Sequence, residues 1–462
     1  MSKRLWLSLG LVVAIALVGW GINRQGKEEE QTAKDAGEEV VVVINGGPKE
    51  TDIVEVNNLK RDIAEFNKIY PNIEIKWTDR AYSPDSFTTS MAGGTAEDVI
   101  SLFATEGYVA ERGYALDITD LIDKWEYRDQ LNLNMLEPFR RGDRFYALPK
   151  SGYIIGMWYN KTMFKEAGLV SDGGKYLVPE DWQELARAAE KLTNRQKNIA
   201  GYGIYGKDAY AGWGMLNWVW QAGGDFEKNI GGKWKAVFDE PEAVTALEFL
   251  KKLRWEYDCF QKNILLGPDQ IWKLFAAGQV AMTNGTNDWV LNLINKYGMK
   301  RENLGMVLLP AGPKGRANQL GGDYWIINPN SSKEVQEAAF KWITWKLLRM
   351  MDPDYVRTNG EQLRKAGQVS TISSIPVFTG EIDEKMRSAA KEYEDVLVDW
   401  PDVWREASKY IHTEPPFFAQ QLYSEYLGPV LQAVLTKKTA DPQKLLQNAA
   451  ENFEVRFLGQ VK

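Results

Sequence analysis

Alternating strand and helix patterns near the start of the chain constrain its fold more than any other feature. The run EVVVVINGG, residues 39–47, has the composition of a buried strand that ends in a glycine turn. Apolar residues from Val56 to Ile69 then follow at helical spacing, and YPNIEIKW (70–77) and AEDVISLF (96–103) return as strands. This order predicts a parallel sheet that helices cover on both faces.

The same alternation starts again in the middle of the chain. YIIGMWYN (153–160) is a predicted strand, and PEDWQELARAAEKLT (179–193) is a predicted helix with one apolar face. YGIYG, VAMTNG and LGMVLLPAG are further strand candidates, and the chain from Glu381 onward is mainly helical in pattern. The sequence therefore predicts two α/β units in series. Ligands of such sheets bind beyond the carboxyl ends of the strands.

Length and composition limit the possible functions. A chain of 462 residues is too long for a single hydrophobic core, so we expect two or more domains. The net charge is −7 with basic and acidic residues interspersed, which argues against nucleic-acid binding. The single cysteine, Cys259, and the single histidine, His412, rule out an intrachain disulfide, a thiolate metal cluster and a multi-histidine zinc site. We expect no cofactor. The sequence leaves open whether a loop binds a calcium ion.

The chain also contains 18 Trp and 20 Tyr residues. Three of these Trp residues lie in AYAGWGMLNWVWQAGG, residues 209–224, which we predict to be one helix. One of its faces would carry Tyr210, Trp213, Asn217 and Trp220. Such rings either fill a core or bind the flat apolar faces of sugars.

The N-terminal residues 1–37 read as a signal or anchor helix followed by a flexible tether. MSKR is basic, and Leu5–Ile22 is a run of 18 residues without a charge. That length lies between a signal-peptide core and a membrane-spanning helix. The folded part is therefore expected at the extracellular face of the membrane, anchored by this helix, or secreted after cleavage.

Motifs for catalysis are weak. INGG lacks the spacing of a nucleotide-binding loop, G-x-S-x-G is absent, and the lone histidine leaves little room for a serine hydrolase triad. A glycosidase would need two facing carboxylates, and the candidates Glu106, Asp288 and Asp323 are scattered along the chain. We expect no enzyme activity.

Several segments resemble, in the same order, the extracellular solute-binding proteins of ABC importers. The most characteristic is YALPKSGYIIGMWYNKTMFKEAGL, residues 146–169, and the others are GGTAEDVI, VPEDWQEL, FAAGQVAMTNG, LGMVLLPAGPKG and GGDYWIINPNSSKEVQEAAFKWITWKL. They cover most of residues 40–350 and look most like the sugar-binding set that includes maltose-binding protein. One departure is Trp20, which stands where Gram-positive members carry a lipidated cysteine.

The resemblance implies a two-lobe α/β fold of the periplasmic-binding-protein type. Each lobe would be a mainly parallel sheet flanked by helices, and a hinged cleft would lie between the lobes. The N-terminal lobe would comprise residues 38–150 and 314–355, the C-terminal lobe residues 151–313 and 375–462, and the crossover residues 356–374. Ligand would stabilise the closed form, which the membrane permease then recognises.

The resemblance also nominates ligand-binding residues. They are aromatic rings for stacking and polar groups for hydroxyls, at the ends of predicted strands and at the start of the helix near residue 210. The set is Trp213, Tyr210, Asp323, Tyr324, Trp289, Asn287, Asn45, Glu106, Thr105 and Tyr82. Asp288 is a weaker candidate, and Trp218 and Trp220 are expected in the core.

The implied function is capture of a carbohydrate, most simply an oligosaccharide, for the transmembrane subunits of an ABC permease. The protein would act as a monomer. Two alternatives stay open at this point: a membrane-anchored enzyme acting on glycans, and a sensor or peptide-binding protein with the same fold.

Overall fold

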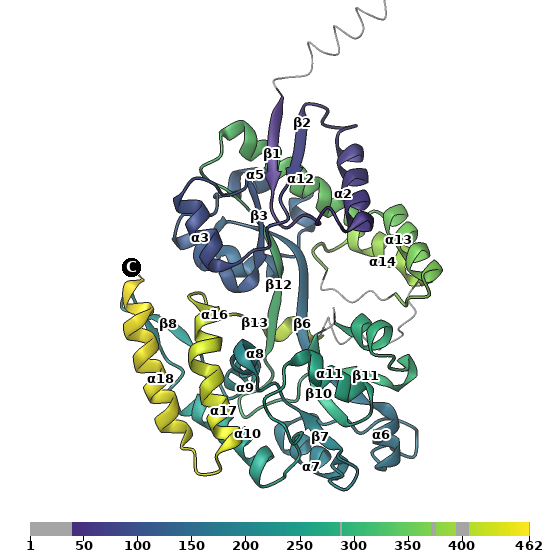
Figure 1. Ribbon diagram of the computed structural model, residues 1–462, viewed down its shortest axis with the longest axis vertical. Coiled ribbons are helices and arrows are strands. Elements are labelled where there is room, and N and C mark those ends of the chain that lie inside the picture. Colours follow the sequence, from purple (N-terminus) through teal and green to yellow (C-terminus); the bar gives the residue numbers. More distant parts are fainter. Residues whose placement is uncertain (1–38, 287–288, 371–375, 394–405, 462) are drawn as a thin grey trace, which may run out of the picture. The chain divides into compact units, whose positions relative to one another are not determined.

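The computed structural model describes residues 39–286, 289–370, 376–393 and 406–461 (Figure 1). The predicted signal or anchor helix and tether, Asn287 and Asp288 lie outside these ranges. The chain divides into two compact units, residues 1–100 with 330–345 and residues 101–329 with 346–462. These bounds differ from those of the expected lobes, which stay a prediction.

The first unit is a parallel sheet with helices, as predicted. Strand β1 (Val40–Ile44) pairs in parallel with β2 (Ile73–Trp77) and with the first residue of β3 (Val99–Phe103). Helices α2 (Ile53–Phe66), α3 (Pro84–Ala92) and the first part of α12 (Lys333–Met351) complete the unit. Its core includes Phe66, which packs edge-on against Trp342 with ring centroids 5.1 Å apart.

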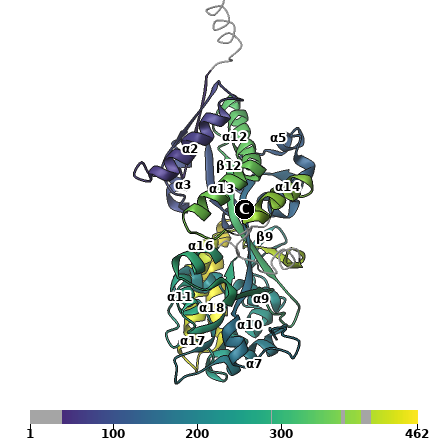
Figure 2. The ribbon, with the colours of Figure 1, turned by 90° about the vertical axis from the view of Figure 1, so that its right-hand side faces the viewer.

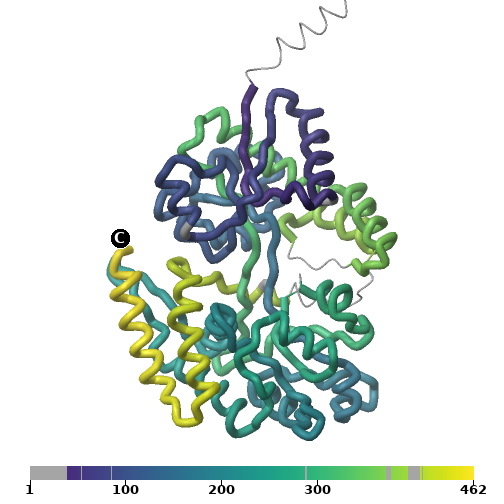
Figure 3. The backbone as a smooth tube through the Cα atoms, viewed as in Figure 1, coloured from purple at the N-terminus to yellow at the C-terminus, as the bar shows by residue number. Residues whose placement is uncertain are grey.

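The second unit is organised around one long strand, β6 (Leu148–Asn160). It pairs antiparallel with β12 (Asn318–Ile327), β10 (Val280–Thr286) and β11 (Leu304–Val307). Strand β10 pairs in parallel with β7 (Ala200–Gly203), and β12 does so with β13 (Ile411–Thr413). The tube in Figure 3 follows β6 and β12 along their shared length. The α/β class is confirmed, and in this unit parallel and antiparallel pairs are mixed.

Helices surround this sheet. The main ones are α6 (Lys161–Glu166), α7 (Trp182–Leu192), α8 (Asp208–Trp213), α9 (Leu216–Gln221), α10 (Pro241–Trp255), α11 (Pro268–Ala276), α13 (Pro353–Lys365), α14 (Glu381–Ala390), α17 (Gly428–Thr436) and α18 (Pro442–Arg456). In Figures 1 and 2, α17 and α18 run side by side near the C-terminus. Helix α13 occupies part of the segment expected to be a crossover.

Shorter elements complete the second unit. They are η1 (Ala104–Glu106), α4 (Tyr108–Glu111), α5 (Thr119–Asp123), η2 (Arg128–Gln130), η3 (Leu133–Phe139), β4 (Arg140–Arg141), β5 (Arg144–Phe145), β8 (Glu227–Ile230), β9 (Lys233–Ala236), η4 (Asn292–Lys296), η5 (Arg301–Asn303), η6 (Lys391–Tyr393), η7 (Ser408–Tyr410), α16 (Ala419–Gln421), η8 (Leu422–Leu427) and η9 (Leu458–Gln460).

The amphipathic pattern of residues 179–193 folds as predicted. Asp181 caps helix α7, since its side chain accepts a hydrogen bond from the backbone N–H of Glu184 at 2.8 Å. Leu185, Ala189 and Leu192 on the predicted apolar face are buried. The Asp181 cap therefore sets the start of this helix, and the sequence period sets the face that it buries.

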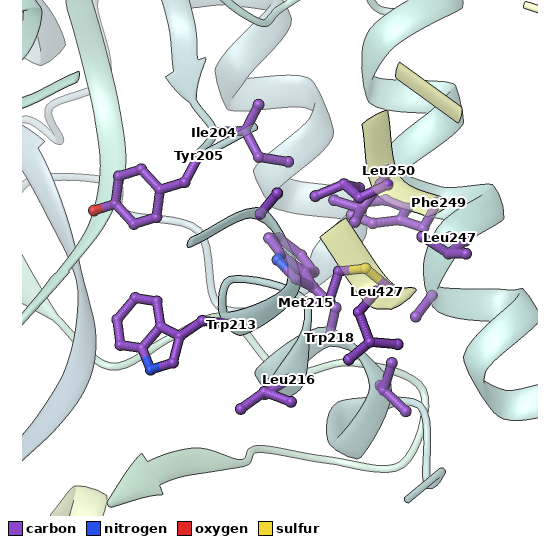
Figure 4. Packing of buried hydrophobic residues seen from close by; sticks show 14 of the residues in the cluster. Ile204, Tyr205, Trp213, Met215, Leu216, Trp218, Leu247, Phe249, Leu250 and Leu427 are labelled. Atoms are coloured by element: carbon purple, nitrogen blue, oxygen red, sulfur yellow. The ribbon is translucent and has the colours of Figure 1, made fainter. Parts of the chain in front are cut away.

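The segment 209–224 is not one helix, contrary to the prediction. It forms α8 and α9, which are separated at Gly214 and Met215, so Trp213 and Trp220 do not share a helical face. Figure 4 shows the rings of Tyr205 and Trp213 close together, whereas Trp218 lies on the side of Phe249. Trp220 is buried and stacks on His412. Both Trp218 and Trp220 are core residues, as expected.

Across the described part of the chain, we find no helix that is both long and apolar enough to span a bilayer. Cys259 is a free, fully buried thiol, and burial raises its pKa to about 12.

The close approach of β7 to α7 gives a stability test. A Cβ atom added at Gly201 would lie 1.8 Å from the carbonyl oxygen of Ala189, so the two backbones would have to separate. Gly201→Ala should therefore lower the free energy of unfolding by about 3 kcal/mol, measured by chemical denaturation. Gly173→Ala is the control, because its nearest neighbour is the Ser171 Oγ at 3.9 Å. Equal stability of the two variants would contradict this packing.

Candidate ligand-binding cavity

The second unit contains a cavity of about 430 Å³, a volume typical of small-molecule sites. All of its lining residues belong to that unit. They are Phe103, Ala104, Thr105, Tyr153, Ala209, Tyr210, Trp213, Trp289, Gly322, Asp323, Glu414, Gln420 and Tyr423.

The carboxyl ends of three strands deliver part of this wall. Phe103 is the last residue of β3, Trp289 follows β10, and Glu414 follows β13 directly. This placement agrees with the rule that ligands of α/β sheets bind beyond the carboxyl ends of the strands. Tyr153 and Asp323 come instead from within the antiparallel pair β6 and β12.

A glycine on β12 makes room for one of the rings. Gly321 is the register partner of Tyr153, and a Cβ atom at position 321 would lie 2.1 Å from Cζ of that tyrosine. Any larger residue at 321 would therefore push the Tyr153 ring out of its place in the cavity wall.

The rings of the wall contact one another. The Trp289 ring lies 5.9 Å from Trp213 and 6.5 Å from Tyr153, measured between centroids, and both pairs are tilted. Tyr210 meets Trp213 edge-on at 6.4 Å. Tyr210 is 47% exposed and Phe103 is 49% exposed, whereas only 8% of Trp213 is exposed. The wall thus combines fixed, buried rings with two rings that are open to a ligand.

Glu414 is a buried carboxyl group of the wall with a shifted pKa. Its carboxylate accepts hydrogen bonds from Gln319 Nε2 at 2.6 Å and from the Tyr423 hydroxyl at 2.7 Å. Burial nevertheless raises its pKa to about 7, because desolvation of the charge outweighs these bonds. The same burial, together with Glu414, raises the pKa of Tyr423.

Only acidic groups bring charge to this wall at neutral pH. Asp323 and Glu414 are the two carboxylates among the lining residues, and none of these residues is Lys, Arg or His. Hydrogen-bond donors on a ligand therefore find carboxylate acceptors here, next to aromatic faces.

Five of the predicted ligand contacts line the cavity: Thr105, Tyr210, Trp213, Trp289 and Asp323. Two other predicted contacts of the second unit, Glu106 and Tyr324, do not line the cavity. Glu106 is buried and accepts a hydrogen bond from Thr105 Oγ1 at 3.2 Å.

Tyr324 is fully buried, and its hydroxyl donates to the Met135 carbonyl oxygen at 2.7 Å. The register of β12 against β6 shifts between Asp323 and Tyr324, and only Asp323 of the two lines the cavity. Asn45 and Tyr82 lie in the first unit, where Asn45 is buried and Tyr82 packs against Phe87.

Sequence reasoning missed Phe103, Tyr153, Glu414, Gln420 and Tyr423. Phe103 and Tyr153 belong to strands that the sequence does predict, and an aromatic residue at a strand end was an available signal. The other three lie in the C-terminal part, where the resemblance offers only a helical pattern.

The described residues offer binding groups rather than a metal site. Among them, no cluster of three or more His, Cys, Asp or Glu side chains could hold a metal ion. The arrangement of rings and carboxylates suits a ligand with apolar faces and hydrogen-bond donors at its edge.

Comparisons with known proteins place the chain in a family. The family model for bacterial extracellular solute-binding proteins matches residues 51–347. A multiple sugar-binding protein from Streptococcus mutans is 23% identical over 348 residues, which cover 71% of this chain and 76% of that protein.

Solved structures share the fold at low identity. An ABC substrate-binding protein from Listeria monocytogenes in complex with cycloalternan superposes with a TM-score of 0.67 at 20% identity, over 90% of this chain and 99% of that chain. UgpB from Mycobacterium tuberculosis, in complex with glycerophosphocholine, gives a TM-score of 0.67 at 17% identity, over 90% and 97% of the chains. The chain belongs to the bacterial extracellular solute-binding proteins, the ligand-capturing components of ABC transporters.

Proposed function

We propose that the protein captures a carbohydrate in the cavity of the second unit and delivers it to the permease of an ABC importer. The observation that carries this proposal is the combination of ring faces and carboxylates on one wall. A pyranose has apolar C–H faces that stack on rings and a rim of hydroxyls that donate to carboxylates. The sugar-binding relative from Streptococcus mutans supports the same ligand class.

The exposed rings favour a ligand longer than one sugar. Tyr210 and Phe103 each leave about half of their surface open, while Trp213 and Trp289 form a deeper pair. Rings at two depths offer more than one stacking surface, so an oligosaccharide would cover apolar area that a single sugar leaves in water.

The other predicted contacts stay part of the proposal. Asn287 lies outside the described residues, and Asn45 and Tyr82 belong to the first unit. Closure of the two lobes on the ligand also stays a prediction, which small-angle X-ray scattering with and without ligand would check. A decrease in the radius of gyration on binding is the expected result.

We also propose that the uncharged run Leu5–Ile22 attaches the protein to the membrane. With Trp20 in place of a lipidated cysteine, attachment would depend on this helix alone. After fractionation of cells, the full chain should sediment with membranes, and a chain lacking residues 1–37 should not. A fully soluble full chain would contradict anchoring.

Calorimetric titration with a panel of neutral oligosaccharides tests the ligand class. At least one glycan should bind, and Trp213→Ala should weaken that binding by roughly 10- to 100-fold, because a central stacking ring is lost. Trp255→Ala is the matched control, since Trp255 donates to the Val434 carbonyl oxygen away from the cavity. Absence of binding by every glycan rejects the proposal, and equal effects of both substitutions reject the role of Trp213.

Asp323 tests the polar part of the site. Asp323→Asn replaces a carboxylate acceptor by an amide of the same shape and should weaken glycan binding by about tenfold without a change in the stoichiometry. Incubation of the glycan with wild-type protein should leave it intact. Release of shorter sugars would instead indicate a glycan-active enzyme.

A further inference from the structure

We propose that Tyr205 and Trp272 hold the Trp213 and Trp289 rings of the cavity wall in the position in which they meet a ligand. Neither Tyr205 nor Trp272 lines the cavity, so both are positioning residues rather than ligand contacts. The inference rests on the proposed function, because it names what fixes the stacking surface of that same site. It comes from four aromatic side chains that contact one another in a closed circuit.

The four rings come from separate segments of the chain. Trp213 and Trp289, which line the cavity, form the outer pair, and their ring centroids lie 5.9 Å apart. Tyr205, which follows β7, and Trp272, on α11, form the inner pair. The Tyr205 ring stacks on Trp213 at 6.4 Å (Figure 4). The Trp272 ring packs against Trp289 at 4.3 Å, so each outer ring has one inner ring against it.

A hydrogen bond between the inner residues closes the circuit. The Trp272 indole N–H donates to the Tyr205 hydroxyl at 3.3 Å, and that hydroxyl donates to the backbone carbonyl oxygen of Asn284. Asn284 belongs to β10, the strand that precedes Trp289 in the chain. The Tyr205 hydroxyl therefore connects both inner rings to the sheet, as donor to one partner and acceptor from the other.

Burial makes this hydroxyl hard to replace. Only 4% of Tyr205 and 7% of Trp272 are exposed, so neither polar group can turn to bulk water. An indole has one donor and no acceptor, and the Tyr205 hydroxyl is the partner of the Trp272 N–H. Loss of the hydroxyl would leave a buried N–H unpaired unless the Trp272 ring moved to another partner. Because Trp272 is in contact with Trp289, such a movement would displace the outer pair.

The position of the outer pair matters for ligand binding because stacking depends steeply on distance. Dispersion contacts weaken as soon as a gap of a fraction of an ångström opens between ring and sugar. Packing of rings is only weakly directional, whereas a hydrogen bond fixes a direction. The inner pair would thus order the outer rings before the ligand arrives, so that less binding free energy is lost in ordering them.

Indole resonances test the positioning role without a ligand. In protein labelled with ¹⁵N-tryptophan, three resonances are assigned by their loss in Trp272→Phe, Trp213→Phe and Trp289→Phe. Tyr205→Phe removes one hydroxyl and keeps the ring, so the Trp272 indole N–H should shift upfield and exchange its hydrogen faster. The Trp213 and Trp289 resonances should shift as well. A shift confined to Trp272 overturns the positioning role, because the outer pair would then be independent of the hydroxyl.

Tyr202→Phe is the matched control. Tyr202 on β7 is 2% exposed, and its hydroxyl donates to the side chain of the same residue, Asn284. Its ring contacts Trp218 and Phe260 instead of the four-ring circuit. Tyr202→Phe should therefore leave the three indole resonances near their wild-type positions. Equal shifts in both Tyr→Phe variants would reflect a general loosening around Asn284 and would overturn the proposal.

Calorimetry tests whether the ring positions matter for binding, with maltotetraose and cellotetraose as the first glycans of the panel. For the glycan that the wild type binds, Tyr205→Phe should raise the Kd by roughly 5- to 10-fold and Tyr202→Phe by less than about twofold. Equal effects of the two variants on the Kd overturn the role of the inner pair in binding. If no glycan binds the wild type, the proposed function fails, while the indole resonances still decide whether Tyr205 and Trp272 hold the outer pair.

Discussion

The antiparallel pairing of β6 with β12 and β10 is the constraint on which the second unit depends. Because β6 is hydrogen-bonded to β12, the side chains of Tyr153 and Asp323 are fixed relative to one another, and β10, which precedes Trp289 in the chain, pairs with the same strand. Glycine at 321 lets the Tyr153 ring occupy its place. A rigid sheet therefore presents the binding groups, as functional sites require.

The cavity wall combines two kinds of group that prefer opposite environments. Aromatic rings favour a dry environment, whereas a carboxylate favours water. Glu414 can be buried in the same wall as Trp213 because Gln319 and Tyr423 donate hydrogen bonds to it. The raised pKa of Glu414 records the part of the desolvation cost that these bonds do not offset. A ligand with both ring faces and donors would complement this wall better than a purely apolar or an anionic one.

The sequence predicts the local structure well where one period dominates. Helix α7 and strands β1, β2, β3, β10 and β11 lie where the patterns place them, whereas β7 overlaps its predicted segment, residues 202–206, at two residues only. The break between α8 and α9 was not predicted, because aromatic residues on several faces suit a buried helix as well as two short ones. Tyr324 lies outside the cavity, and the sequence does not show this because adjacent strand residues cannot be assigned to a face without knowing the register.

Long-range assembly explains the rest of the site. Glu414 and Tyr423 are far from Trp213 in sequence. The pairing of β13 with β12 brings Glu414 to the wall, and the packing of η8 against α8 brings Tyr423 there. The most direct measurement of the central claim is a crystal structure with a bound oligosaccharide. The account predicts sugar rings stacked on Trp213 and Tyr210, with hydroxyls donating to Asp323. A glycan bound elsewhere, with this cavity filled only by water, would contradict it.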